Sequence, residues 1–197
     1  RSPITSKSKK PKIVGTHRRI STLDEDEIGF PARKYLSAHS DAFVIVLDDL
    51  ERDRSAIHAL VFARYRDALD AILCHETRHR ASVHFFVFMI EAYYFADTRA
   101  IRDALGVNIG NYDGDVEKIP HPKNYLKQLA PGFDEIQDGK RIVATLDLRQ
   151  ILSDPNTCLS LRALFRWCSR AMNIPFSEEF RLIDGRDCSV TGSQACL

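Results

Sequence analysis

Four acidic side chains follow directly on an apolar segment, and they are the residues of this sequence best suited to chemistry. The apolar segment is 42–47 (AFVIVL), and the acids are Asp48, Asp49, Glu51 and Asp53. Carboxylates crowded together either raise one another's pKa or recruit a cation. Mg²⁺ or Mn²⁺ is the cation that a few carboxylate oxygens hold most readily. The pattern therefore predicts a divalent metal site, with Mg²⁺ or Mn²⁺ as the cofactor.

A structural explanation of the same acids stays open. Asp53 stands where it would cap a helix beginning at Arg54, because aspartate is a preferred N-cap residue. Arg52 and Arg54 would then neutralise the remaining carboxylates. An acid-rich strand end is a weak signal by itself, so both interpretations are kept.

The elements that position these acids follow from the hydrophobic pattern. The run 42–47 is continuous and rich in β-branched residues, which predicts a strand buried on both faces of a parallel sheet. Apolar residues at three- and four-residue spacing predict a helix over 54–74, and the run 83–90 (VHFFVFMI) predicts a second buried strand. A strand, a helix and a strand in this order form a parallel pair with a right-handed crossover, and such sheets bind ligands at the carboxyl ends of their strands. Those ends are Asp48 and Glu91.

The C-terminal half is expected to be helical. Asp97 is placed to cap its first helix and Gly106 to end it. Pro122 suits the first turn of the next helix, where its missing N–H is not needed. The expected helices cover 98–105, 122–129, 140–152 and 159–172.

Length and composition are those of an ordinary globular protein. With 197 residues the chain is long enough to build one hydrophobic core. Its 44% hydrophobic and 28% charged residues exclude a disordered, fibrous or membrane-embedded chain. The longest apolar run, 83–90, is far shorter than the roughly 20 residues of a membrane-spanning helix. We expect a tail and loop over 1–30, a single α/β domain over 31–180 and a weakly ordered tail over 181–197.

Charge is nearly balanced over the whole chain. The net charge of +1 provides no general attraction to nucleic acid. Residues 1–19 nevertheless carry seven basic side chains and no acid. This segment could contact phosphates through counterion release, or it could be a solvated tail.

Cysteine usage indicates a reducing compartment. The five cysteines are an odd number and lack the close pairing of a zinc site or a disulfide framework. Reduced, structural thiols are therefore expected. No secretory signal is recognisable before the predicted fold, so we expect a cytoplasmic protein.

Other candidate residues carry weaker signals. His75, His79 and His84 have the side chain of a metal ligand, but the predicted helix ends near His75 and a surface turn is favoured there. Trp167 is expected to pack in the core rather than to stack on nucleic-acid bases. No Gly-rich phosphate loop occurs, so any ATPase activity would belong to a separate protein.

Four ordered segments resemble a known family. They are VIVLDDLERD, VHFFVFMIEAYYFADTRAIRDALG, IPHPKNYLKQL and DGKRIVATLDLRQIL, between Phe43 and Met172. The chain thereby resembles bacterial domain-of-unknown-function family 4276. That family is similar to the Toprim fold of topoisomerases, primases and the nucleases of overcoming-lysogenization-defect proteins. The resemblance implies a Rossmann-like (Toprim-like) α/β fold, a mostly parallel sheet flanked by helices with a helical C-terminal half.

The resemblance also implies a set of catalytic residues. The Toprim acidic pair of the D-x-D type falls on Asp49 and Glu51, with Asp53 as a third carboxylate and Glu91 at the end of the neighbouring strand. Glu51 stands in place of the usual second Asp, which keeps the charge and lengthens the reach by one methylene. Toprim catalysis also uses a glutamate in an E-G turn after an earlier strand, and no segment of 1–42 shows that pattern.

The activity that the resemblance implies is metal-dependent hydrolysis of phosphodiesters. Lys123, Lys140 and Arg141 would orient the phosphate, unless they are solvated surface residues. Such a nuclease would serve anti-phage defence or genome maintenance beside a separate ATPase. An inactive module that binds an ATPase or a nucleic acid is the alternative, and a small-molecule or nucleotide-binding protein is a third. A homo-oligomer is also considered, and no membrane is expected.

Overall fold

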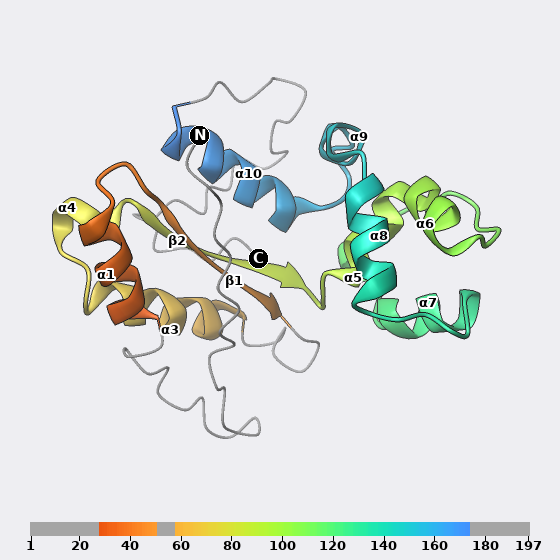
Figure 1. Cartoon of the computed structure of the whole chain (residues 1–197), viewed down its shortest axis with the longest axis horizontal. Helices are drawn as coiled ribbons and strands as arrows, with labels where there is room; N and C mark the ends of the chain where they lie inside the picture. Colours follow the sequence, from red (N-terminus) through yellow and green to blue (C-terminus); the bar gives the residue numbers. More distant parts are fainter. Residues whose placement is uncertain (1–27, 51–57, 174–197) are drawn as a thin grey trace.

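The computed structural model describes residues 28–50 and 58–173, which form a mixed α/β fold with a small parallel sheet of two strands. In chain order the elements are α1 (Gly29–Ala38), β1 (Val44–Leu50), α3 (His58–Asp70), α4 (His75–Arg78), β2 (Ala81–Val87), α5 (Glu91–Tyr94), η1 (Phe95–Asp97), α6 (Thr98–Leu105), η2 (Val116–Lys118), α7 (Pro122–Leu129), α8 (Gln137–Thr145), α9 (Leu148–Ser153) and α10 (Leu159–Ala171). Figure 1 shows α3 and α10 on opposite sides of the strands, and α5 to α9 beyond the strands' carboxyl ends.

The two strands pair as the sequence predicted. They run parallel, with Val44 opposite Ala81 and Leu50 opposite Val87. Their bounds differ from the prediction, because β1 continues to Leu50 and β2 ends at Val87 instead of Ile90. In the described part of the chain no further strand joins this pair. The Rossmann-like, Toprim-like arrangement therefore stays a prediction.

The two faces of the sheet are covered by different helices. On one face, Val83 and Phe85 of β2 are buried with Tyr65 and Leu69 of α3. On the other face, His84 of β2 lies against Trp167 of α10. The helix after β1 thus covers the sheet as expected, and α10 supplies the second layer over β2.

Strand β1 is less buried than predicted. Ile45 and Leu47 are 41% and 43% exposed, so the prediction of burial on both faces was wrong for this strand. The reason is geometric, because α10 packs mainly on β2 and leaves these alternate side chains of β1 uncovered.

Buried hydrophobic side chains form two clusters among the described residues, where the length of the chain had suggested one core. The first joins α1, α3 and one face of the sheet, and includes Leu36 and Leu50. The second gathers side chains from α5 to α10 and includes Phe95, Ile101 and Ile142.

Most predicted helix boundaries in the C-terminal half are confirmed. Gly106 ends α6 with φ +66°, the left-handed conformation that glycine adopts without strain, and α7 begins at Pro122. The single helix predicted over 140–152 was wrong, because α8 ends at Thr145 and α9 begins at Leu148. Asp147 interrupts it.

Asp147 ends one helix and starts the next through two hydrogen bonds. Its Oδ1 accepts a bond from Gln150 N (3.1 Å), which caps α9, and its own N–H donates to Asp97 Oδ2 (2.9 Å). The second bond ties this corner to the start of α6. Within 28–50 and 58–173, no helix has both the length and the apolar character needed to cross a bilayer.

Candidate functional site

The carboxyl end of β1 holds the loop that leads from β2 to α5. Phe88 N donates to Leu50 O (2.8 Å), and Ile90 N donates to Asp49 Oδ1 (3.2 Å). Phe88 has a φ of 62°, a left-handed conformation that turns the chain at this point. Glu91 is the first residue of α5 and is buried. The structure therefore brings Asp49 and Glu91 to the same end of the sheet.

Asp48 does not share this site with Asp49. Both residues lie inside β1 rather than after it, and successive side chains of a strand point to opposite faces. Asp48 Oδ2 accepts a hydrogen bond of 2.6 Å from the hydroxyl of Tyr65 on α3. The four-acid cluster expected from the sequence is thus divided at its first two members.

The other two acids of that cluster cannot be placed. Glu51 and Asp53, the second and third carboxylates of the predicted metal site, lie outside the described residues. So do Arg52 and Arg54, on which the capping alternative depends. Both interpretations of these residues stay predictions.

Lys123 lies beside the acidic pair. It belongs to the first turn of α7, and its Nζ is 3.0 Å from Glu135 Oε2 and 3.9 Å from Glu91 Oε1. Its hydrogen bond to Glu135 and the nearby charges of Glu91 and Asp49 raise the pKa of Lys123. Lys123 is therefore a positive charge held by Glu135 and Glu91.

Two further residues complete the group, and sequence reasoning missed both. Glu135 holds Lys123 and also accepts a hydrogen bond of 3.1 Å from Lys127, and these lysines lower the pKa of Glu135. Tyr94 is the last residue of α5 and is 3% exposed. We call Asp49, Glu91, Tyr94, Lys123 and Glu135 the strand-end site.

Tyr94 is uncharged at any ordinary pH. Burial, followed by the charges of Glu91 and Asp49, raises the pKa of Tyr94 to about 12. Tyr94 lies three residues after Glu91, so the two side chains share one side of α5. A signal for Tyr94 existed in the sequence, since helical spacing relates it to Glu91, but an aromatic residue in an apolar run indicates core packing first.

The DGKR segment contributes to the site through its glycine. A Cβ at Gly139 would stand 3.1 Å from the Tyr94 hydroxyl, so α8 approaches Tyr94 closely at this residue. Lys140 is exposed and makes no side-chain hydrogen bond or ion pair with the described residues. Arg141 is exposed and pairs with Asp138 on its own helix. Neither of these predicted phosphate-binding residues is joined to the strand-end site by a contact.

The described carboxylates are too few to hold a magnesium-type ion by themselves. Within the described ranges, no group of three or more His, Cys, Asp or Glu side chains is arranged to hold a metal. Asp49 and Glu91 supply two carboxylates, and Mg²⁺ is commonly held by one or two carboxylates together with water and substrate phosphates. The described residues therefore form no closed metal cage, and an ion held by these two carboxylates would need further ligands from water or substrate.

A buried hydrogen-bond network holds α5 in place below the site. The Tyr93 hydroxyl accepts a bond from Val87 N (3.1 Å) and donates to Glu117 Oε1 (2.9 Å). The same oxygen of Glu117 accepts a bond from Ser160 N (2.8 Å) at the start of α10. Burial raises the pKa of Glu117 despite these bonds. The end of β2, α5, η2 and α10 therefore meet at one carboxylate.

The other candidates from the sequence, three histidines and one tryptophan, lie either in the core or on the surface. His84 is buried with its Nε2 2.8 Å from Ser82 Oγ, and burial lowers the pKa of His84 to about 4. His75 and His79 are exposed around the short helix α4. Trp167 is buried and packs edge-on against Phe43, which confirms its predicted packing role.

The cysteines in the described ranges form no disulfide. Cys74, Cys158 and Cys168 are free thiols there. Burial raises the pKa of the Cys158 thiol to about 12, which keeps this thiol protonated at neutral pH. Cys188 and Cys196 lie outside the described residues.

The fold and the site define a mixed α/β protein with an acidic pair at the carboxyl end of a parallel sheet. No family model, curated protein or solved structure matches this chain.

Proposed function

We propose that this chain is a metal-dependent phosphodiester hydrolase with a Toprim-like fold, and that the strand-end site is its reaction centre. Two observations support the proposal, the ordered segments that resemble family 4276 and the position of Asp49 and Glu91 where parallel sheets bind ligands. The hydrogen bond from Ile90 N to Asp49 Oδ1 (3.2 Å) carries it, because this bond joins the two strand ends that supply the carboxylates.

Each residue of the site has a role in this proposal. Asp49 and Glu91 would hold Mg²⁺ or Mn²⁺, with Glu51 and Asp53 as further ligands. Such an ion supplies an activated water and stabilises charge on the leaving oxygen. Lys123 would orient a phosphate oxygen, since its raised pKa keeps the ammonium charged. Lys140 and Arg141 stay in the proposal as surface contacts to a longer substrate.

The biological setting is proposed from the resemblance. It is a bacterial anti-phage defence or genome-maintenance system in the cytoplasm, in which the chain works with a separate ATPase on nucleic acid. Assembly of several copies of the chain belongs to the same proposal.

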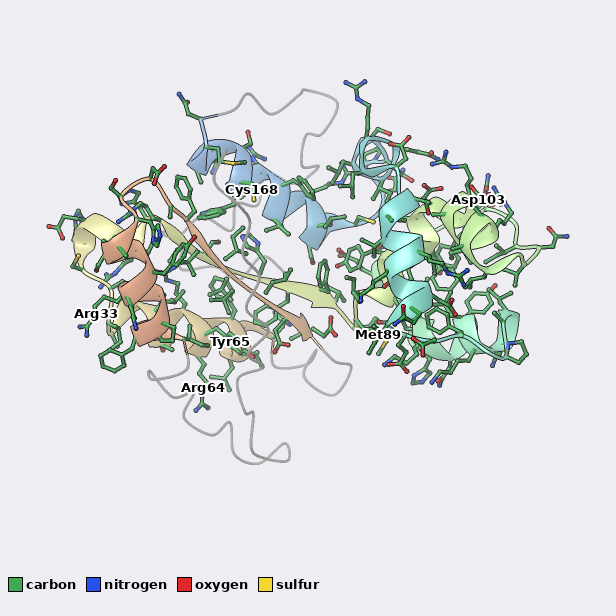
Figure 2. The ribbon with its side chains drawn as sticks, in the orientation of Figure 1. Arg33, Arg64, Tyr65, Met89, Asp103 and Cys168 are labelled. Carbon is green, nitrogen blue, oxygen red and sulfur yellow. The ribbon has the colours of Figure 1, made fainter. Side chains whose placement is uncertain are left out.

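Cleavage of plasmid DNA in the presence of Mn²⁺ tests the activity. We expect Asp49→Asn and Glu91→Gln each to lower the cleavage rate at least about tenfold, as loss of groups that orient a catalytic metal does. Asp103→Asn is the matched control, because Asp103 is an exposed acid on α6 that Figure 2 shows away from Met89 in the β2–α5 loop. Wild-type protein without metal-dependent cleavage, or equal cleavage by all three variants, would reject the proposed reaction centre.

A second candidate function rests on the ion pair of Lys123. Its Nζ lies 3.9 Å from Glu91 Oε1, so an internal cation already offsets part of the charge that a metal would neutralise. This contact favours an inactive module that binds an ATPase or a nucleic acid through the same face. Calorimetric titration with Mn²⁺ separates the two, because the hydrolase binds the ion at Asp49 and Glu91 and the inactive module does not.

A further inference from the structure

The hydroxyl of Tyr94 is a hydrogen-bond donor that has no acceptor among the described residues. Tyr94 is 3% exposed, and its hydroxyl makes no hydrogen bond within the described part of the chain. Three side-chain atoms there are sealed from solvent and make no hydrogen bond: Arg78 Nε, which still pairs with Asp70 Oδ1 at 2.9 Å, Ser160 Oγ and Arg162 Nη2. The Tyr94 oxygen, which also lacks a hydrogen bond, is not among these sealed atoms.

The neighbouring Tyr93 makes the hydrogen bonds that are expected of a buried structural tyrosine. Buried tyrosine hydroxyls usually find a partner inside the protein. Tyr93 follows that rule, because its hydroxyl bonds both Val87 N and Glu117 Oε1. Tyr94 is the next residue on the same helix, and its hydroxyl makes no hydrogen bond with the described residues.

The position of the unused hydroxyl ties it to the strand-end site. Tyr94 and Glu91 share one side of α5, and the hydrogen bond that Asp49 accepts from Ile90 N holds Asp49 beside the start of that helix. At α8, any side chain larger than that of Gly139 would press on the hydroxyl. The charges of Glu91 and Asp49 therefore act on this phenol, and the backbone of α8 lies against its hydroxyl at Gly139.

The chemistry of the site indicates what this hydroxyl binds. Asp49, Glu91 and Glu135 only accept hydrogen bonds when ionised, so an anion entering the site depends on the few donors present. Lys123 is one donor, but Glu135 and Glu91 already share its ammonium. A neutral phenol beside the carboxylates adds a donor without adding charge that would compete with a metal.

We propose that the Tyr94 hydroxyl binds substrate by donating a hydrogen bond to a non-bridging phosphoryl oxygen in the strand-end site. The identity of the substrate as a phosphodiester rests on the proposed function. The role of Tyr94 as the donor to a phosphoryl group rests on the geometry of α5 and α8.

Binding of inorganic phosphate, measured by calorimetry in the presence of Mg²⁺, tests this role without requiring cleavage. Loss of one neutral hydrogen bond is expected to weaken phosphate binding by Tyr94→Phe about five- to tenfold. The ring is kept, so the melting temperature should not change. Tyr125→Phe is the matched control, because Tyr125 is an exposed tyrosine of α7 that stacks on Phe95, and its affinity should equal that of wild type.

Gly139→Ala tests the same hydroxyl through its contact with α8. The added Cβ would displace the hydroxyl and weaken phosphate binding in the wild-type background. In the Tyr94→Phe background the oxygen is gone, so Gly139→Ala should have no further effect. An equal loss in both backgrounds would mean that Gly139 acts independently of the Tyr94 hydroxyl.

The outcomes distinguish this inference from the proposed function. Equal phosphate affinity of wild type and Tyr94→Phe, or no phosphate binding by wild type, overturns the role of Tyr94. Phosphate binding that depends on Tyr94, in a protein that leaves plasmid DNA intact, upholds the inference and rejects the hydrolase. Cleavage that persists in Tyr94→Phe with an unchanged KM upholds the hydrolase and rejects the inference.

Discussion

The Tyr65 hydroxyl donates a hydrogen bond of 2.6 Å to Asp48 Oδ2 and thereby connects α3 to β1 across the covered face of the sheet. Tyr65 is almost completely buried, and its ring also meets that of Phe85 on β2 at 5.2 Å between centroids. Figure 2 shows Tyr65 on α3, at the face of the sheet opposite α10. This contact gives Asp48 a structural role and leaves Asp49 as the acid of the pair that faces the β2–α5 loop.

Replacing Tyr65 by phenylalanine should destabilise the protein without affecting the strand-end site. Hydrogen bonds to charged groups contribute roughly 1.5–3 kcal/mol, so we expect the free energy of unfolding to fall by about 2 kcal/mol. Urea denaturation followed by circular dichroism measures this change. Mn²⁺ affinity should stay that of wild type, and a loss of metal binding in Tyr65→Phe would show that Asp48 belongs to the metal site after all.

The opposite directions of Asp48 and Asp49 explain how far the sequence could define the site. Residue types indicated a cation-binding strand end, and the βαβ pattern related it to Glu91 across the sheet. The sequence did not indicate where the strand ends. Side chains alternate between the two faces only within the strand, so the position of its end decides which acids point to the same face. Because β1 continues to Leu50, alternation separates the two aspartates.

Contacts between distant segments account for the rest of the difference. Glu135 and Gly139 meet the site only because α7 and α8 pack beside α5, and no local periodicity encodes that packing. The break between α8 and α9 has the same origin, since the N–H of Asp147 bonds Asp97 Oδ2, fifty positions earlier in the chain. The exposed side of β1 likewise depends on where α10 packs.

His84 should make the stability of the protein depend on pH. Its pKa is lowered to about 4 by burial, whereas an unfolded histidine titrates near 6.5. Between these values the unfolded chain binds the proton and the folded chain does not, so acid favours unfolding. The contribution of His84 is complete above pH 6.5 and is lost as the pH falls towards 4, with a full size of about 3 kcal/mol.

His84→Gln isolates this effect, because glutamine can keep a hydrogen bond to Ser82 but has no proton to gain. Glu117 titrates with the opposite sign, since its pKa is raised in the fold and its protonation stabilises the folded state. The informative quantity is therefore the difference in free energy of unfolding between wild type and variant at pH 7 and at pH 4. A difference that does not change with pH contradicts the assignment to His84.

Gly29 should be required for the crossing of α1 and α3. A Cβ at this residue would lie 2.4 Å from Ala68 O and 2.6 Å from Ile72 Cγ1, both closer than van der Waals contact. Separating the helices costs roughly 1–3 kcal/mol, so Gly29→Ala should lower the free energy of unfolding by about 2 kcal/mol. Gly132→Ala is the control, because a Cβ there meets no atom within 4 Å. Equal stability of the two variants in urea would show that the crossing adjusts without cost.

Lys123 should oppose metal binding and assist cleavage. Its ammonium lies 3.9 Å from Glu91 Oε1, so it repels the two positive charges of an ion held there by roughly 1–2 kcal/mol in a water-like medium. Lys123→Gln should therefore raise Mn²⁺ affinity about tenfold. The same change should slow plasmid cleavage, because the substrate phosphate loses its charged donor.

Lys127→Gln separates this local effect from a general change of charge. Lys127 bonds Glu135 at 3.1 Å, as Lys123 does at 3.0 Å, but only Lys123 also pairs with Glu91 among the described residues. Calorimetry should consequently show wild-type Mn²⁺ affinity for Lys127→Gln and tighter binding for Lys123→Gln. Wild-type affinity in both variants would place the ion away from Glu91. Tighter binding in both variants would mean that only the net charge of the protein matters. Tighter binding confined to Lys123→Gln, together with slower cleavage, would show that Lys123 lies close to both the metal and the phosphate.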